Sequence, residues 1–221
     1  MKKIKKIAVF VFMLTILPPC FPKQKINTAS ATPEERIENF PFTYKNDKNN
    51  RSKIAHKKAI INYIKDHQSS KSSLSPEKIY ENADSLCKIY NIDIDYIIAI
   101  MRQESRYYQG AVGPKFKVNG RYRRAYGICQ IVYEGAYDTA RWHGGPQYSW
   151  EDVINYNYAN IDVACYYLTY TWKYHNGVNS TEELICAYNA GPYNVSEYLN
   201  RENYNYVKNV MKYVNEIKDS Y

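Results

Sequence analysis

Several patterns that would point to other classes of protein are missing from this chain of 221 residues. No alternating run of apolar and polar residues is long enough for a convincing strand, so we expect a mainly α fold. The four histidines are scattered and lack the spacing of metal ligands, so we expect no metal and no other cofactor. The apolar run from Ile7 to Leu17 is too short for a comfortable membrane span.

That run is instead typical of an export signal, because four lysines precede it within the first six residues. We therefore predict that residues 1–31 form a signal peptide or an N-terminal anchor, and that the protein acts in the periplasm or cell envelope. The small residues at 29–31 offer a cleavage site, Cys20 stands where a lipoprotein carries its lipid, and an uncleaved anchor also fits.

The net charge of +8 is unevenly distributed along the chain. Residues 1–75 carry 15 basic and 5 acidic side chains, whereas residues 76–221 carry 15 and 17. The main domain is therefore nearly neutral, and we expect no nucleic-acid partner. The basic N-terminal part suits a membrane surface, an envelope polymer or a cell-envelope transport apparatus, and a solvated linker explains it equally well.

Four cysteines lie beyond the leader, at positions 87, 129, 165 and 186. In an exported protein they permit two disulfides with three possible connectivities. Buried free thiols are the alternative, because each cysteine has apolar neighbours at helical spacing.

The periodicity divides the rest of the chain into a connector and a main domain. Residues 32–75 are predicted to be a basic connector with one amphipathic helix, from Ser52 to Gln68, that lies on a membrane or packs on the main domain. The main domain, residues 76–221, begins with Ser75 as N-cap and Pro76 in the first helical turn. About seven helices are expected, over residues 76–90, 93–104, 126–140, 157–174, 181–189, 195–201 and 204–218. A basic loop within residues 113–125, with an Asn-Gly turn, is predicted to form a short hairpin that lines or covers a cleft.

Glu104 is an acidic residue at a position where the helical periodicity predicts an apolar one. It shares a helical stripe with Ile97 and Ile100, and such a stripe should face the core. Apolar surroundings raise the pKa of a carboxyl group, so Glu104 is a candidate general acid. A Glu that bends out to solvent at a helix end is the alternative.

Four short segments accompany this residue in the sequence: 104–105, 126–131, 187–192 and 202–207. In this order they resemble the SLT domain of soluble lytic transglycosylases, lysozyme-like relatives of goose-type lysozyme that cleave peptidoglycan glycan strands. The resemblance covers roughly residues 76–218, and its most specific segment is Ala187-Tyr188-Asn189-Ala190-Gly191. It implies a lysozyme-like fold, and a helix over residues 155–167 that backs the site.

The resemblance also implies the site residues. Glu104 would be the sole catalytic acid and base, and the substrate would be held by Ser105, Tyr126, Gly127, Gln130, Tyr188, Asn189 and Tyr206. Several of them could instead have structural roles. Gly127 could start or end a helix, the side-chain amides of Gln130 and Asn189 could form hydrogen bonds with backbone groups, and Tyr206 could pack in the core. Gly113 departs from the family, which usually has a serine at this position.

Glu104 is the one acidic residue among the site residues that the resemblance implies, although most glycosidases use two carboxylates. This favours substrate-assisted cleavage, in which the 6-hydroxyl of N-acetylmuramic acid attacks and a 1,6-anhydro product forms. A hydrolytic muramidase remains an alternative. So does a non-catalytic glycan-binding module that remodels the wall for a secretion or conjugation apparatus.

Overall fold

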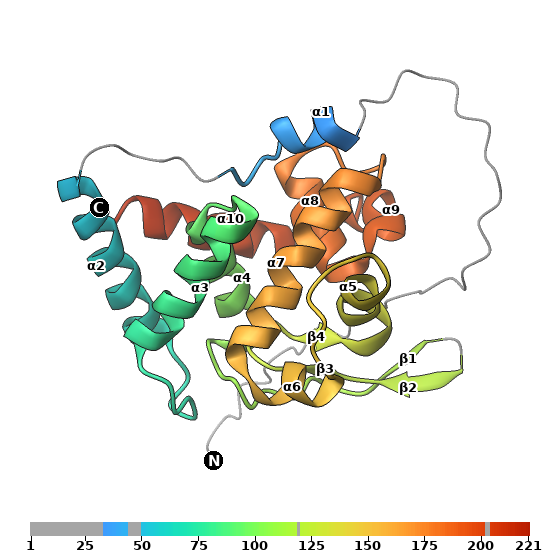
Figure 1. Ribbon diagram of the computed structural model, residues 1–221, viewed down its shortest axis with the longest axis horizontal. Helices are drawn as coiled ribbons and strands as arrows, with labels where there is room; N and C mark the ends of the chain where they lie inside the picture. Colours follow the sequence, from blue (N-terminus) through green and yellow to red (C-terminus); the bar gives the residue numbers. More distant parts are fainter. Residues whose placement is uncertain (1–32, 44–49, 119, 202–203) are drawn as a thin grey trace, which may run out of the picture.

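The computed structural model describes residues 33–43, 50–118, 120–201 and 204–221 (Figure 1). The expected leader, including Cys20, and two residues of the last motif, Glu202 and Asn203, lie outside this part of the chain. Its helices are α1 (Pro33–Glu38), α2 (Asn50–His67), α3 (Pro76–Tyr90), α4 (Ile94–Ser105), the π-turn η1 (Tyr133–Tyr137), α5 (Asp138–Trp142), α6 (Trp150–Asn155), α7 (Asn157–Tyr174), α8 (Thr181–Ala190), the 3-10 turn η2 (Pro192–Asn194), α9 (Val195–Leu199) and α10 (Asn205–Lys218). Two antiparallel pairs of strands complete it: β1 (Phe116–Val118) with β2 (Arg121–Arg123), and β3 (Ala125–Tyr126) with β4 (Ile131–Val132). The prediction of a mainly α fold is therefore confirmed.

Helix α4 carries Glu104 and is buried along most of its length. All residues from Ile94 to Met101 are inaccessible to solvent or nearly so, and the helix packs against α2, α3 and α10. Asp93 caps its first turn by accepting a hydrogen bond from the Asp95 amide at 3.1 Å. The helix ends where Arg106 adopts a left-handed conformation, with φ of 53°. This ending fixes Glu104 in the last turn, at the edge of the core.

Helix α7 runs through the middle of the molecule (Figure 1). It packs against α1, α3, α6 and α8, and eleven of its 18 residues are buried. Its bounds match the prediction. Because the helix contacts neighbours on several sides, apolar residues occur around most of its circumference.

The residues before Pro76 share one core with the residues after it. Ile60 and Ile64 of α2 are fully buried in the main cluster, and Phe42 stacks on Tyr96 with ring centroids 4.0 Å apart. Arg36 of α1 donates hydrogen bonds to carbonyl groups at the end of α7, including that of Trp172 at 2.7 Å. The amphipathic helix therefore packs on the main domain.

The prediction of one helix over residues 126–140 is wrong for its first half. Residues 125–132 form β3, a tight turn and β4, and helical structure begins only at Tyr133. Gly127 (φ 80°) and Gln130 (φ 51°) are both left-handed, which a right-handed helix does not allow. The hairpin expected within residues 113–125 is confirmed, with Phe116 opposite Arg123 and Lys117 opposite Tyr122.

The question of whether the cysteines form disulfides has an answer in the described part of the chain. There, Cys87, Cys129, Cys165 and Cys186 are buried free thiols. The same residues contain no group of histidine, cysteine and acidic side chains suited to a metal, and no helix long and apolar enough to cross a membrane.

Candidate active site

Glu104 faces the hydroxyl of Tyr206 at the centre of the candidate site. Tyr206 lies in the first turn of α10, which packs directly on α4, and its hydroxyl donates a hydrogen bond of 2.5 Å to Glu104 Oε1. Burial raises the pKa of Glu104 to about 8, and the hydrogen bond from Tyr206 opposes this rise. Near neutral pH the carboxyl group therefore holds a proton that it can donate.

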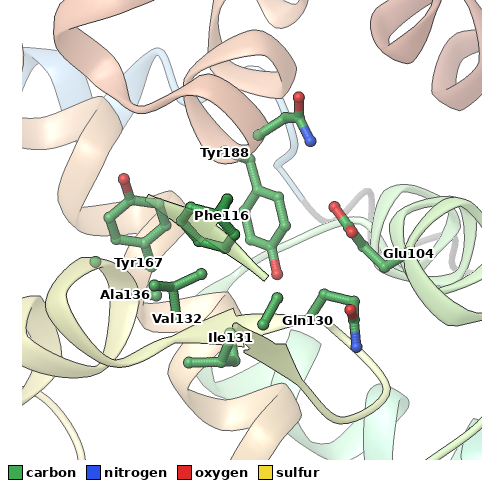
Figure 2. A pocket seen from close by; sticks show the side chains of 11 residues that line it. Glu104, Phe116, Gln130, Ile131, Val132, Ala136, Tyr167 and Tyr188 are labelled. Carbon is green, nitrogen blue, oxygen red and sulfur yellow. The ribbon is translucent and has the colours of Figure 1, made fainter. Parts of the chain in front are cut away.

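A pocket of about 440 Å³, including its open mouth, lies beside this carboxyl group (Figure 2). Three predicted residues, besides Glu104, line it: Gln130, Tyr188 and Asn189. The rest of the lining is mostly apolar, from Phe116, Ala125, Ile131, Val132, Gly135, Ala136 and Tyr167.

Gln130 ends the turn between β3 and β4. Its side-chain nitrogen donates hydrogen bonds to the carbonyl groups of Gly127 at 2.9 Å and Ala111 at 3.2 Å. The side-chain oxygen lies next to Gly113, where an added Cβ would come within 2.8 Å of it. The amide is thus fixed in orientation by its nitrogen. The glycine that departs from the family pattern leaves room for the oxygen.

Asn160 of α7 holds this turn from behind. Its side-chain oxygen accepts a hydrogen bond from the Cys129 amide at 2.8 Å, and its nitrogen donates to the carbonyl groups of Tyr126 and Val153. Gly127 touches the same amide, since a Cβ there would lie 2.3 Å from Asn160 Nδ2. One buried amide therefore sets the backbone that presents Gln130 to the pocket.

Tyr188 and Asn189 come from the last turn of α8. The hydroxyl of Tyr188 donates to the Cys129 carbonyl at 2.7 Å, which leaves the side of its ring on the pocket (Figure 2). Asn189 is 7% exposed, and its oxygen accepts a hydrogen bond from Tyr204 at 2.9 Å. Within the described structure its side-chain nitrogen is buried without a hydrogen-bond partner, although it borders the pocket. A ligand acceptor in the pocket would satisfy that nitrogen.

Ser105, Tyr126 and Gly127 do not line the pocket. Ser105 donates a hydrogen bond to the Ile128 carbonyl at 2.8 Å and so joins the end of α4 to the β3–β4 turn. The ring of Tyr126 packs edge-on against Trp150, at 5.7 Å between centroids. In the structure these residues and Gly127 support the pocket wall, which agrees with the structural roles left open for the glycine.

Much of the apolar wall carries no sequence signal of its own. Phe116 belongs to the hairpin that was expected to line a cleft, and Tyr167 belongs to the helix expected to back the site. Gly135 and Ala136 come from η1, where Gly135 has non-helical angles (φ −111°, ψ −107°). No motif or periodicity marks that distortion, although π-type turns are frequent at functional sites.

The electrostatics of the pocket are simple. Among its described lining residues, Glu104 is the one acidic side chain, and no basic side chain accompanies it. Burial raises the pKa of both Tyr188 and Tyr206, so both phenols stay neutral and act as hydrogen-bond donors. The site can deliver one proton and take one back, in partly apolar surroundings.

Part of this chain is similar to known proteins. Residues 81–211 match the model of the transglycosylase SLT domain. A crystal structure of an inactive mutant of the lytic transglycosylase Slt from Pseudomonas aeruginosa is similar, with a TM-score of 0.49 and 24% identity over 63% of this chain. The similarity spans only 24% of the length of that protein. No curated protein matches the chain.

Proposed function

The chain belongs to the transglycosylase SLT domain family, a family of glycan-cleaving enzymes, and we propose that it is a peptidoglycan lytic transglycosylase with Glu104 as its one catalytic acid and base. One observation carries the proposal. Glu104 is the one carboxyl group among the described pocket residues, and its pKa is raised to about 8. A group that works alone must be protonated at the start and ionised in the middle of the reaction.

The proposed reaction cleaves the β-1,4 bond between N-acetylmuramic acid and N-acetylglucosamine. Glu104 donates its proton to the bridging oxygen as the bond to C1 of the muramic acid breaks, and the N-acetyl group of that sugar stabilises the cation-like carbon. The Glu104 carboxylate then accepts the proton of the 6-hydroxyl, whose oxygen bonds to C1. The product is a 1,6-anhydro sugar, the proton returns to Glu104, and no water is consumed.

Two features of the pocket support this sequence of steps. The Tyr206 hydroxyl remains on Glu104 Oε1 and stabilises the carboxylate during the interval in which it is charged. Phe116, Val132 and Tyr167 give the pocket an apolar wall that disfavours water, so an internal nucleophile has the advantage. A hydrolytic muramidase, in which water attacks instead, needs the same acid and is the principal alternative.

The test is digestion of purified peptidoglycan sacculi with the full chain, followed by mass spectrometry of the fragments. We expect anhydro ends from the wild type and no soluble fragments from Glu104→Gln. Reducing ends in place of anhydro ends would show that the enzyme is a hydrolase. Undiminished lysis by Glu104→Gln would refute the role of Glu104. Tight binding without release of fragments by the wild type would instead favour the non-catalytic glycan-binding module.

We also propose that the protein is exported and works in the periplasm or cell envelope, with the basic N-terminal segment near the membrane or a transport apparatus. The charge pattern of the first 31 residues supports this. Fractionation of cells that express a C-terminally tagged chain tests it, and recovery of the tag only in the cytoplasm would overturn it.

A further inference from the structure

A second group of aromatic rings lies along one face of α7. Tyr166, Tyr170 and Tyr174 follow each other at intervals of four residues, so they share one face of the helix. The centroid of Tyr170 lies 6.0 Å from that of Tyr166 and 4.8 Å from that of Tyr174. We call these three rings, together with His143, His175 and Tyr193, the outer aromatic row.

The rings of the row are in contact and partly open to solvent. Tyr170 contacts His143 at 4.8 Å and His175 at 6.0 Å, and His175 contacts Tyr193 at 5.2 Å. Tyr174 is 50% exposed and Tyr193 is 62% exposed. An exposed tyrosine alone needs no explanation, but a continuous set of rings on one surface marks an interaction site.

One member of the row, Tyr193, lies near a residue of the pocket. Tyr193 follows the pocket residue Asn189 by four positions, in the short η2 turn after α8. Burial raises the pKa of Tyr170, and the nearby Tyr193 raises it further. Tyr193 acts in the same direction on Tyr167, which lines the pocket, so it lies close to both the pocket wall and the row.

The charges on this surface suit a glycan that carries carboxylates. No carboxylate is among the groups that shift the pKa of Tyr166, Tyr170 or His175, and the ammonium group of Lys173 lies over the Tyr174 ring at 5.1 Å. Burial lowers the pKa of His175 to about 4, so its ring is neutral near pH 7. The row therefore consists of mostly uncharged rings with a cation at one end.

We propose that the outer aromatic row is a second glycan-binding surface, which holds the β-1,4-linked strand after it leaves the pocket by stacking sugar rings on tyrosine rings. The inference rests on the proposed function in taking a glycan as the ligand. A wall strand is far longer than the pocket, so the rest of it must lie on the protein surface or in solvent. The C–H groups on one face of a pyranose ring pack against an aromatic face, which buries apolar surface on both partners.

The test uses full-length protein with Glu104→Gln, so that no turnover occurs, and oligomers of β-1,4-linked N-acetylglucosamine as the probe. Affinities for the dimer and the octamer are measured by calorimetry in this parent and with Tyr174→Ala or Tyr193→Ala added. We expect either substitution to weaken octamer binding by about fivefold to tenfold, as truncation of an interfacial aromatic does. Binding of the dimer should not change. Tyr156→Ala, at a tyrosine that is 63% exposed at the opposite end of α7, is the matched control and should behave as the parent.

Several results would overturn the proposal. The first is that neither substitution changes the affinity for the octamer. The second is that the substitutions lower the affinities for the dimer and the octamer equally, and the third is that the parent does not bind the octamer. Circular dichroism confirms that the variants are folded, which their exposed positions lead us to expect. Lysis of sacculi by the wild type is scored separately. If the tyrosine substitutions weaken octamer binding but the wild type does not lyse sacculi, only the proposed function is refuted. If the wild type lyses sacculi but the substitutions leave octamer binding unchanged, only the role of the outer aromatic row is refuted.

Discussion

The raised pKa of Glu104 has a consequence for stability that can be measured without any substrate. In the unfolded chain a glutamate titrates near its ordinary value of 4.5, whereas in the folded protein Glu104 titrates at about 8. Between these values the folded state binds the extra proton, so its free energy of unfolding falls as the pH rises from about 4.5 to 8 and is level above that. Glutamine has a similar shape and does not titrate. The Glu104→Gln substitution should therefore remove this decrease in the free energy of unfolding with rising pH.

The size of the effect follows from the shift. A carboxyl pKa raised from 4.5 to about 8 corresponds to a preference of about 5 kcal/mol for the protonated form in the folded state. Glu104 is only partly buried, and solvent screening reduces such a figure, so we expect about half of it. Above pH 8 the Glu104→Gln protein should be about 2–3 kcal/mol more stable than the wild type, and near pH 4 the two should be equal.

Urea unfolding followed by circular dichroism at pH 4, 6, 7 and 9 measures this difference. Glu77→Gln, in the exposed first turn of α3, makes the same change of charge and should show no such trend. A difference between Glu104→Gln and wild type that stays constant from pH 4 to pH 9 would refute the reasoning, because it would mean that Glu104 titrates alike in the folded and unfolded states.

Three other substitutions test separate parts of the site. Tyr206→Phe removes the hydrogen bond that lowers the pKa of Glu104, so turnover should fall by about tenfold or more and the alkaline limb of the pH–rate profile should move to higher pH. An unmoved limb would contradict this. Gly127→Ala should cost about 2 kcal/mol or more in urea unfolding, because φ is 80° and the added Cβ would lie 2.3 Å from a buried amide nitrogen; a loss under about 0.5 kcal/mol would be inconsistent with that clash. Arg121→Glu, on the same face of the β1–β2 hairpin as the pocket residue Phe116, should slow cleavage of peptide-bearing strands but not of peptide-free strands. Lys117→Glu on the opposite face is its control, and equal effects of the two would argue against recognition by this face.

The fold was predictable where apolar residues mark a buried helix. The bounds of α4 follow from its apolar stripe, and those of α7 follow from a long apolar segment that is buried on several sides. The β3–β4 turn was not predictable in this way. Its conformation depends on Gln130 at positive φ, held by hydrogen bonds to Gly127 and Ala111 that no local propensity encodes.

The candidate site was likewise predictable from the sequence only in part. The apolar stripe identifies Glu104 as an unusual carboxylate, but its partner Tyr206 is 102 positions away, and only the resemblance to a family pairs them. Val132 of β4 and Gly135 of η1 reach the pocket because both elements pack beside α7, which is a tertiary effect. For Ser105 and Tyr126, the motifs indicate importance without distinguishing contact with a ligand from support of the wall.

The β1–β2 hairpin leaves and rejoins the body of the protein at nearly one point. The Gly113 amide donates to the Ala125 carbonyl at 2.8 Å, the Gly127 amide donates to the Ala111 carbonyl at 2.9 Å, and Val112 pairs with Tyr126 between them. Residues 114–124 therefore form a loop whose two ends are tied together. Because Gln130 is held by Gly127 and Ala111, which lie outside this loop, we expect segments of other lengths and charges to be tolerated there. This makes the hairpin a natural position at which relatives could diverge in substrate preference, and at which an engineer could graft a new recognition loop while the proton-transfer residues stay in place.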